Sequence, residues 1–377
     1  MATDFDEYID RTGTSSTKFE RYRNSDVLPL WVADMDFRSP PAVIDALLER
    51  VSHGVFGYTD TSDALHEAII ERLARLYDWR ITAEDLVYLP GVVPALNLAC
   101  RALAGPGEGV MTATPVYPPF LEAPGNSGRR LVTLQSREHD GRWQLALDEL
   151  EAKAADASLL LLCNPYNPVG RALTAAELAA ISEICEAHQV LICSDEIHCD
   201  LLFDGIRHIP MATVGKAARR TVTLMAPSKT FNLAGLGGSF AVIQNPELRE
   251  RFLQEKHGLV PGVNLLGLTA MLAAYRHGDE WLRELLVYLQ SNRDFLADAL
   301  AAIPGIRMNA VEATYLAWLD VSALGLADPP AHFERAGLGM SEGFRFGDDR
   351  YMRLNFGCTR RVLETAVERL AGAARGN

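Results

Sequence analysis

Short apolar runs alternate with amphipathic segments through the middle of this chain, and that alternation restricts the possible fold more than any other feature. Strands that are buried on both faces and joined by helices form a parallel sheet with helices on both sides. The apolar runs have the length of such strands. We expect strands at residues 110–113, 130–134, 159–163, 190–194, 221–225 and 239–243.

The pattern changes after about Gly278. Residues 280–302 predict a long amphipathic helix, which is followed by strands at 313–320 and 350–355 and by a helix at 360–374. These elements predict a smaller α+β domain. The first forty or so residues show no strand pattern, and we expect them to pack against this domain.

The overall composition limits the classes of partner. The chain has 377 residues, of which 48% are hydrophobic and 23% charged, so it can bury a large core. A net charge of −13 without a run of Lys and Arg argues against nucleic acids and anionic membranes as partners. Six cysteines with no C-x-x-C pair indicate buried thiols in a reducing compartment, and neither disulfides nor a metal site. Because no apolar run is long enough for a membrane span and no signal-peptide pattern is present, we expect a cytoplasmic protein.

Lys229 follows the apolar run at 221–225. A lysine just past a buried strand loses part of its hydration, which lowers its pKa and makes the amine nucleophilic. A surface lysine at a strand end is the ordinary alternative. The preceding Ser228, which is suited to hold a phosphate, and the glycine-rich residues 234–238 favour a functional lysine.

Asp195 directly follows a second predicted strand, at 190–194, where a carboxylate can pair with a protonated pyridine nitrogen. Alone it would read as a helix cap. Together with Lys229 and Ser228 it completes the set that pyridoxal 5′-phosphate (PLP) requires, namely an amine for an imine, a carboxylate for the ring nitrogen and a hydroxyl for the phosphate. His198, three residues later, either reaches the phenolic oxygen of this cofactor or is a packed core histidine.

Three further motifs follow predicted strands. The prolines and glycine of residues 164–170 force a turn in which Asn167 can reach both the phenolic oxygen and a substrate carboxylate. Residues 90–94 precede a helix expected from about 95 to 103, and a helix N-terminus suits a phosphate. Tyr117 either stacks on the pyridine ring or is a core tyrosine.

Arg353 lies in the predicted strand at 350–355, where its apolar neighbour Leu354 points to the opposite face. A guanidinium fork at this position can bind the α-carboxylate of a substrate through two parallel hydrogen bonds. A surface salt bridge is the alternative.

Together these residues resemble the fold type I PLP-dependent enzymes, the aspartate aminotransferase superfamily. The chain is further similar to the MalY/PatB type of cystathionine β-lyase, the C–S lyases, at residues 9–14, 28–37, 53–58, 116–120 and 353–358. The resemblance implies a large PLP-binding domain at 46–278, with a mostly parallel seven-stranded sheet between helices. It also implies a smaller α+β domain built from 1–45 and 279–377.

The resemblance implies a role for each motif. Lys229 is the Schiff-base lysine, and Asp195 is the partner of the ring nitrogen. Asn167 is the donor to the phenolic oxygen, Arg353 binds the α-carboxylate, and Tyr117 stacks on the ring.

The resemblance also implies the residues around these groups. Those beside the phosphate are Gly91, Val92, Val93 and Ser228. Those beside the substrate are Trp31, Ala33, Asn167 and Arg353. Tyr58 acts across the interface of a homodimer, where it reaches the phosphate or the substrate in the neighbouring subunit's site.

Three positions depart from related families. Tyr166 stands where the related lyases usually carry His, which puts the pocket near Asn167 in doubt. Gly237 stands where many aminotransferases place a phosphate-binding arginine, and His198 where many have tyrosine. The lyases share the last two departures, so these favour a lyase.

The resemblance therefore implies α,β-elimination from L-cystathionine or a related L-cysteine S-conjugate, which gives pyruvate, ammonia and a thiol. An aminotransferase would use the same residues and is the alternative. A regulatory protein with secondary catalysis is a third possibility, although no basic patch or added domain favours it.

Overall fold

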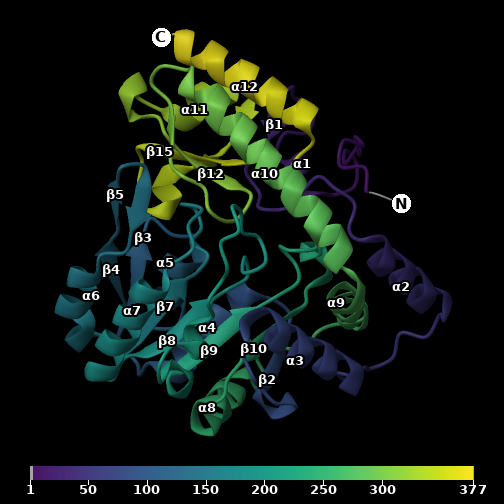
Figure 1. Cartoon of the computed structure of the whole chain (residues 1–377), viewed down its shortest axis with the longest axis vertical. Helices are drawn as coiled ribbons and strands as arrows, with labels where there is room; N and C mark the ends of the chain where they lie inside the picture. The colour runs from purple at the N-terminus through teal and green to yellow at the C-terminus, as the bar shows by residue number, and fades with distance from the viewer. Residues whose placement is uncertain (1–2, 377) are drawn as a thin grey trace.

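The computed structural model describes residues 3–376 and contains two main sheets (Figure 1). The larger sheet has seven strands in the order β2-β10-β9-β8-β7-β3-β4, and the smaller has four in the order β11-β12-β15-β14. In Figure 1 the larger sheet lies in the lower part of the molecule, and the smaller sheet lies above it beside α10 to α12. The expected α/β fold with a second, smaller α+β region is confirmed.

The larger sheet is parallel except for β10, which runs antiparallel to both of its neighbours. Its strands are β2 (Leu86–Leu89), β3 (Gly109–Thr114), β4 (Arg130–Gln135), β7 (Leu159–Cys163), β8 (Leu191–Asp195), β9 (Thr221–Met225) and β10 (Ser239–Val242). All six strands expected from apolar runs are present. The short strand β2 was not recognised locally, because its four residues carry too little pattern to stand out.

Helices cover this sheet on both faces. They are α2 (Pro41–Ser52), α3 (Asp63–Tyr77), α4 (Val92–Leu103), α5 (Pro119–Asn126), α6 (Leu147–Lys153), α7 (Ala175–Ala187), α8 (Pro246–Lys256) and α9 (Leu265–His277). Phe240 and Val242 of β10 join a core cluster with α3 and α9, whereas Ala241 and Ile243 join a second cluster with α4, α7 and α8. Successive side chains of a strand point to opposite faces, so the two clusters lie on opposite sides of the sheet.

The smaller sheet is antiparallel. Its strands are β11 (Arg307–Met308), β12 (Leu316–Asp320), β14 (Ser341–Glu342) and β15 (Tyr351–Asn355). The helices beside it are α10 (Asp279–Ala301), α11 (Pro329–Arg335) and α12 (Arg360–Arg375). A separate hairpin of β5 (Arg137–His139) and β6 (Arg142–Gln144) belongs to neither main sheet.

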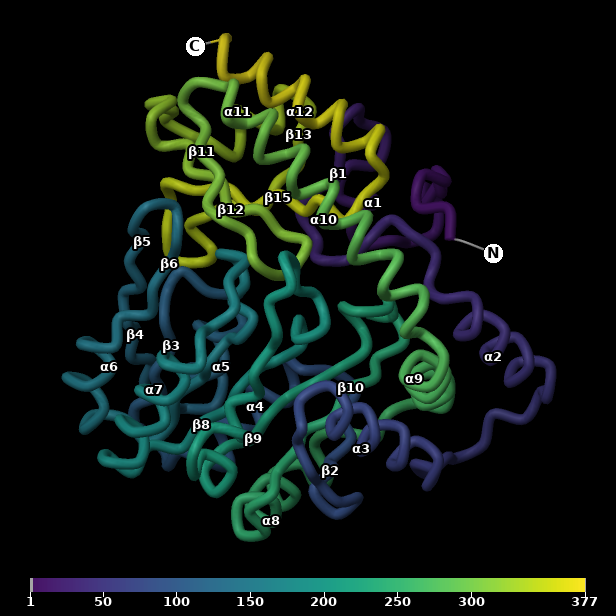
Figure 2. Tube along the Cα trace, in the orientation of Figure 1, coloured from purple at the N-terminus to yellow at the C-terminus, as the bar shows by residue number. Residues whose placement is uncertain are grey.

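The N-terminal segment lies against the C-terminal part of the chain (Figure 2). It contains the short helix α1 (Thr17–Glu20) and the strand β1 (Leu28–Pro29), which pairs in parallel with β13 (Leu338–Gly339). The segment shows no strand pattern of its own, and the two-residue strand β1 is fixed by its distant partner β13. The domain boundaries at 45/46 and 278/279 stay a prediction.

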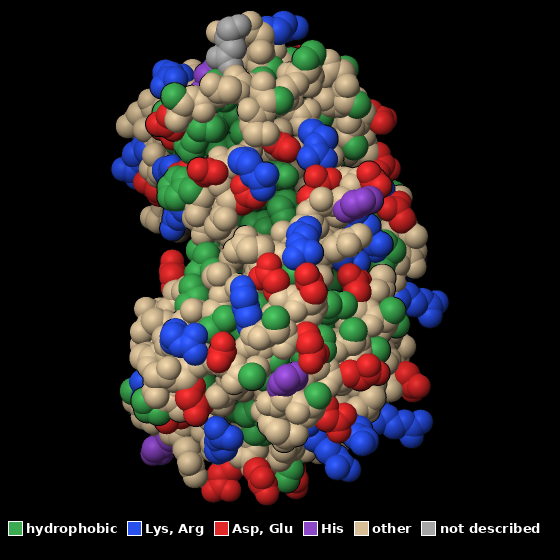
Figure 3. Space-filling view, turned by 90° about the vertical axis from the view of Figure 1, so that its left-hand side faces the viewer, with side chains coloured by type: hydrophobic (Ala, Val, Ile, Leu, Met, Phe, Trp, Pro, Cys, Tyr) green, Lys and Arg blue, Asp and Glu red, His purple; other side chains and the backbone are tan. Residues whose placement is uncertain are grey.

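On the face drawn in Figure 3, acidic and basic side chains are interspersed over both halves of the molecule. None of the helices within residues 3–376 is long and apolar enough to cross a membrane.

The carboxyl ends of the central strands β7, β8 and β9 face the smaller sheet. In open parallel sheets, ligands bind at this edge.

Candidate active site

A cavity of about 540 Å³ lies at this edge of the sheet. It brings together residues that are far apart in the sequence, and nearly all the predicted site residues line it. They are Trp31, Ala33, Gly91, Val92, Val93, Tyr117, Asn167, Asp195, His198, Ser228, Lys229 and Arg353. The exception is Tyr58, which does not line the cavity of its own chain.

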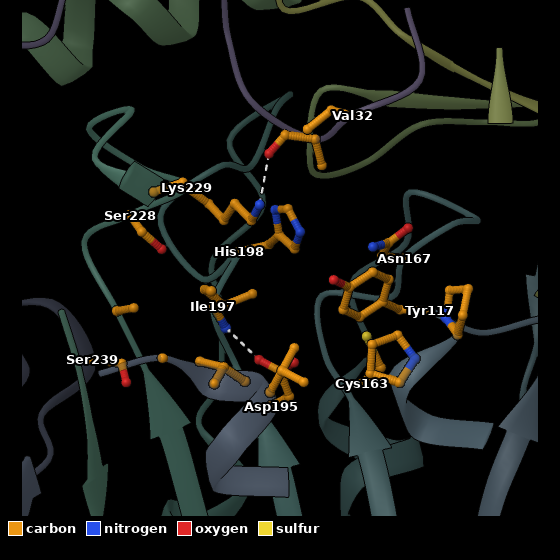
Figure 4. A pocket seen from close by; sticks show the side chains of 18 of the residues that line it. Val32, Tyr117, Cys163, Asn167, Asp195, Ile197, His198, Ser228, Lys229 and Ser239 are labelled. Carbon is orange, nitrogen blue, oxygen red and sulfur yellow. Dashed lines mark hydrogen bonds between the residues drawn. The ribbon is translucent and has the colours of Figure 1, made fainter. Parts of the chain in front are cut away.

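Lys229 reaches into the cavity from the loop after β9, and its Nζ donates a hydrogen bond to the carbonyl of Ala33 at 2.6 Å (Figure 4). Burial lowers the pKa of this amine to about 8, and the positive charge of Arg353 acts in the same direction. The carboxylates of Asp34 and Asp195 oppose the shift. With a pKa of about 8, roughly a tenth of the Lys229 amine is neutral and nucleophilic at about pH 7.

Asp195 is the last residue of β8 and is only 4% exposed. Burial raises the pKa of its carboxyl to about 7, while a hydrogen bond from the Ile197 amide at 3.1 Å acts against that rise. Within the described chain this carboxylate has no ion-pair partner. A cationic N–H group placed against Asp195 would therefore gain a strong, charge-assisted hydrogen bond.

Arg353 and Asn167 meet at the side of the cavity that faces the smaller sheet. Nη1 of Arg353 donates to Oδ1 of Asn167 at 3.0 Å, which leaves the amide nitrogen of Asn167 turned toward the cavity (Figure 4). Nη2 of Arg353 donates to the carbonyl of Trp31 at 2.7 Å, and its guanidinium lies over the Phe346 ring. Its Nε is buried with no partner among residues 3–376, so the described chain leaves one donor of the fork unused. Burial lowers the pKa of Arg353 to about 10, so the group stays charged at neutral pH.

The opposite end of the cavity is formed by the start of α4. The helix begins at Val92 with Gly91 as its N-cap, so the expected start near residue 95 was wrong by three residues. The free amides of this first turn and the Ser228 side chain face the cavity and suit a phosphate.

Gly237 lines the same end of the cavity with a φ of +61°, and a Cβ there would lie 3.2 Å from the Pro90 carbonyl. This backbone disfavours the arginine that many aminotransferases carry at this position.

His198 and Tyr117 flank the space between these two ends (Figure 4). His198 is 2% exposed, and its Nδ1 has no partner among residues 3–376. Burial, with the charges of Lys229 and Arg353, holds its pKa well below the usual value, so the ring is neutral. Burial also raises the pKa of the Tyr117 hydroxyl. The structure thus brings both aromatic residues to the cavity, as predicted.

The predicted site residue Tyr58 and the departing position Tyr166 do not line this cavity. Tyr58 lies between α2 and α3 and is fully exposed, and the nearby Phe56 is 60% exposed. Tyr166 is 4% exposed, and its hydroxyl lies 3.2 Å from Oγ of Ser136, away from the cavity lining. Tyr166 therefore does not line the cavity wall beside Asn167.

Sequence reasoning missed several residues of the site. Glu122, Glu342 and Arg345 line the cavity mouth, and Cys163 lies at its base. Glu342 is already paired with Arg21 at 2.8 Å, whereas Arg345 is half exposed and only 4.0 Å from Glu342. No strand-end motif marks the three charged residues, so no local signal distinguished them from surface charges. Cys163 ends β7 and was interpreted only as a buried thiol.

The cavity fits PLP on its own chemistry. Asp195 is a buried carboxylate with no ion pair among residues 3–376, Lys229 is an amine with a lowered pKa, and the start of α4 offers free amides for a phosphate. The fold and this site define a PLP-dependent enzyme.

Comparison with known proteins gives the family. The aminotransferase class I and II family matches residues 25–370, and the chain belongs to this family. The chain is 37% identical to cystathionine beta-lyase PatB of Bacillus subtilis (strain 168), over 98% of this chain and 99% of that protein.

Two solved structures are similar over their whole length. The crystal structure of OvoB superposes with a TM-score of 0.97 at 48% identity and covers 99% of this chain and 100% of that one. Cystalysin from Treponema denticola, whose crystal structure contains PLP, superposes with a TM-score of 0.96 at 32% identity and covers 100% of both chains. The resemblance seen in the sequence is therefore confirmed.

Proposed function

We propose that the chain is a PLP-dependent carbon–sulfur lyase that converts L-cystathionine or related L-cysteine S-conjugates into pyruvate, ammonia and a thiol. The observation that carries this proposal is the position of Lys229, whose amine has a pKa of about 8, in one cavity with Arg353. The first residue is suited to remove a proton and the second to hold a carboxylate. The name of the relative PatB supports the same activity.

The chain's own groups orient the substrate. Arg353 binds the α-carboxylate through its fork, and the amide of Asn167 lies beside it. With the carboxylate fixed, the Cα–H bond is held toward Lys229. When bound, PLP supplies an electron sink that accepts the pair released at Cα. Asp195 would pair with the ring nitrogen of bound PLP and keep it protonated.

Removal of the Cα proton is coupled to cleavage of the Cβ–S bond. Neutral Lys229 takes the Cα proton, the Cα–Cβ double bond forms and the Cβ–S bond breaks, so the sulfur leaves with its electron pair as a thiolate. The resulting aminoacrylate tautomerises to an imine, which water hydrolyses to pyruvate and ammonia. The cavity mouth at Glu122 and Arg345 leaves room for the thiol portion.

An aminotransferase is the alternative within the same family, since it would start with the same proton abstraction. Purified enzyme incubated with L-cystathionine in the absence of a keto acid separates the two. We expect many turnovers, with pyruvate and thiol released in equal amounts. A single turnover that resumes only when a keto acid is added would replace the lyase by a transaminase.

We further propose a cytoplasmic homodimer in which Tyr58 of one subunit completes the site of the other. Tyr58 and Phe56 are exposed on an extended segment and do not line the cavity of their own chain. Cations on the cavity lining include Arg345, Arg353 and Lys229, and none of them lies in the α4 turn that would hold the phosphate. A donor from a second subunit at that end would supplement the helix amides. Division into domains at 46–278 and at 1–45 with 279–377 belongs to the same proposal.

A further inference from the structure

Residues 31–37, here called the strap, lie between β1 and α2, and Trp31, Val32 and Ala33 line the cavity. Side chains from elsewhere in the chain donate hydrogen bonds to most of the strap's carbonyl groups. Asn355 donates from Nδ2 to the carbonyls of Val32 and Asp34, both at 2.6 Å. Asn232 donates from Nδ2 to the carbonyls of Met35 and Phe37 at 2.9 and 2.8 Å. Neither asparagine lines the cavity, so these bonds do not compete with ligands.

The carbonyls of Trp31 and Ala33 differ, because each accepts from a cationic side chain that lines the cavity and from a hydroxyl. The carbonyl of Trp31 accepts from Nη2 of Arg353 at 2.7 Å and from Oγ of Ser341 at 2.8 Å. The carbonyl of Ala33 accepts from Nζ of Lys229 at 2.6 Å and from the hydroxyl of Tyr315 at 2.9 Å. In each pair one donor is a group that we assign to substrate or cofactor, and the other is a hydroxyl.

This pairing has a consequence during turnover. A substrate carboxylate competes with Trp31 for the Arg353 fork, and the cofactor competes with Ala33 for the Lys229 amine. Each carbonyl then keeps its hydroxyl donor, so neither is left as an unpaired polar group at the cavity wall. Ser341 is 6% exposed and Tyr315 is 1% exposed, so water does not readily replace either hydroxyl.

We propose that Ser341 and Tyr315 are positioning residues that hold the strap over the site while Arg353 and Lys229 are engaged with substrate and cofactor. Ser341 also accepts from Nη2 of Arg353 at 3.2 Å, so it links the α-carboxylate clamp to the strap. The proposal rests on the roles assigned above to Lys229 and Arg353. It predicts an effect that depends on the state of the site, whereas a purely structural role would act in every state.

Amide hydrogen exchange of the strap tests this in the whole enzyme, as wild type, Ser341→Ala and Tyr315→Phe. Each protein is measured free of cofactor and again with PLP and an S-alkyl-α-methyl-L-cysteine, which has the carboxylate but no Cα proton to lose. Tyr88→Phe is the matched control, because the Tyr88 hydroxyl is buried without a partner among residues 3–376 and does not touch the strap. We expect both test variants to match wild type without cofactor. When loaded, they should exchange strap amides roughly two- to tenfold faster, the range for loss of one hydrogen bond.

Equal exchange of the strap amides in wild type and both test variants, all loaded with PLP and the cysteine analogue, would overturn the proposal. Faster exchange in the test variants both with and without cofactor would also overturn it. Visible absorbance of bound PLP in wild type and Lys229→Ala is recorded alongside. If Lys229→Ala keeps the wild-type band, the assignment of the lysine fails, whatever the strap does. If that assignment holds and the strap is unchanged, only the positioning roles of Ser341 and Tyr315 fail.

Discussion

Arg353 of β15 donates from Nη1 to Oδ1 of Asn167 at 3.0 Å, and this bond joins the smaller sheet to the turn that follows β7. It orients the Asn167 amide so that its nitrogen faces the cavity. It also fixes one side of the guanidinium while Nε remains unpaired within the described chain. The two residues therefore form one preoriented unit for a carboxylate and a phenolic oxygen.

Replacement of the Arg353 guanidinium should weaken substrate binding more than it slows the chemical step. Arg353→Lys keeps the charge but cannot hold both Asn167 and a carboxylate, so we expect KM to rise by about 10- to 100-fold with a smaller change in kcat. Arg350→Lys is the control, because the exposed Arg350 pairs with Asp348 at 2.7 Å and does not line the cavity. Steady-state kinetics with L-cystathionine measure both. A loss confined to kcat would contradict the proposed role.

Asp195 should destabilise the cofactor-free protein in a pH-dependent manner. Its folded pKa of about 7 exceeds the ordinary value of 3.8, so between these values the unfolded chain loses a proton that the folded chain keeps. Stability from this group therefore falls as pH rises through that window. Asparagine does not titrate, so Asp195→Asn should be more stable than wild type by roughly 2–4 kcal/mol at about pH 8 and by much less at about pH 4.

Urea unfolding of the cofactor-free proteins measures this difference, with the exposed Asp156→Asn as the control. The same substitution should weaken PLP binding and lower kcat, because the ring nitrogen loses its anionic partner. An identical difference in stability at both pH values would show that the Asp195 carboxyl is not abnormally hard to ionise.

The charge of Arg353 should lower the pKa at which Lys229 becomes reactive. Only the neutral amine attacks the cofactor aldehyde, so attachment of PLP to the cofactor-free enzyme should accelerate as pH rises through about 8. Because Arg353 disfavours the ammonium form of Lys229, Arg353→Gln should raise that midpoint. Arg345→Gln is the control. Arg345 lines the same cavity but is not among the charges that shift the pKa of Lys229, so this variant should keep the wild-type midpoint. Growth of the visible band gives the rates, and a lower midpoint in Arg353→Gln would contradict the electrostatic account.

Tyr58 should complement Lys229 between subunits. Lys229→Ala and Tyr58→Ala homodimers should each be impaired, whereas a mixed dimer contains one site with both native residues. We expect mixed and refolded chains to recover up to about a quarter of wild-type activity, as random pairing with one native site per mixed dimer requires. No recovery in a sample shown to contain mixed dimers would place Tyr58 outside the partner's site.

The sequence predicted the parts of the site that lie directly after strands. Asp195 and Lys229 each follow a buried apolar run, and the carboxyl ends of neighbouring parallel strands necessarily meet at one edge. The residue types of Asp195 and Lys229 also match specific groups of a cofactor. A lysine, an aspartate and a phosphate-binding turn at the same edge restrict the cofactor before any contact is known.

The sequence did not predict contacts that depend on the approach of the smaller sheet. Tyr315 reaches Ala33 from 282 positions away, and Ser341 reaches Trp31 from 310. Neither residue has a motif, since a hydroxyl that donates to a carbonyl is set by packing and not by spacing. Arg345 was missed for the same reason. The position of Tyr58 in an assembly depends on a second chain, so no feature within one chain fixes it.

Thiol release by Lys229→Arg tests the central claim most directly, because arginine keeps the size and charge of the side chain but cannot act as the base. The variant and wild type are saturated with PLP and given L-cystathionine without a keto acid, and free thiol is counted per chain. The account predicts sustained release by wild type and a rate lower by about 1,000-fold or more in a folded Lys229→Arg. Release by the variant at more than about a tenth of the wild-type rate would show that Lys229 does not start carbon–sulfur cleavage.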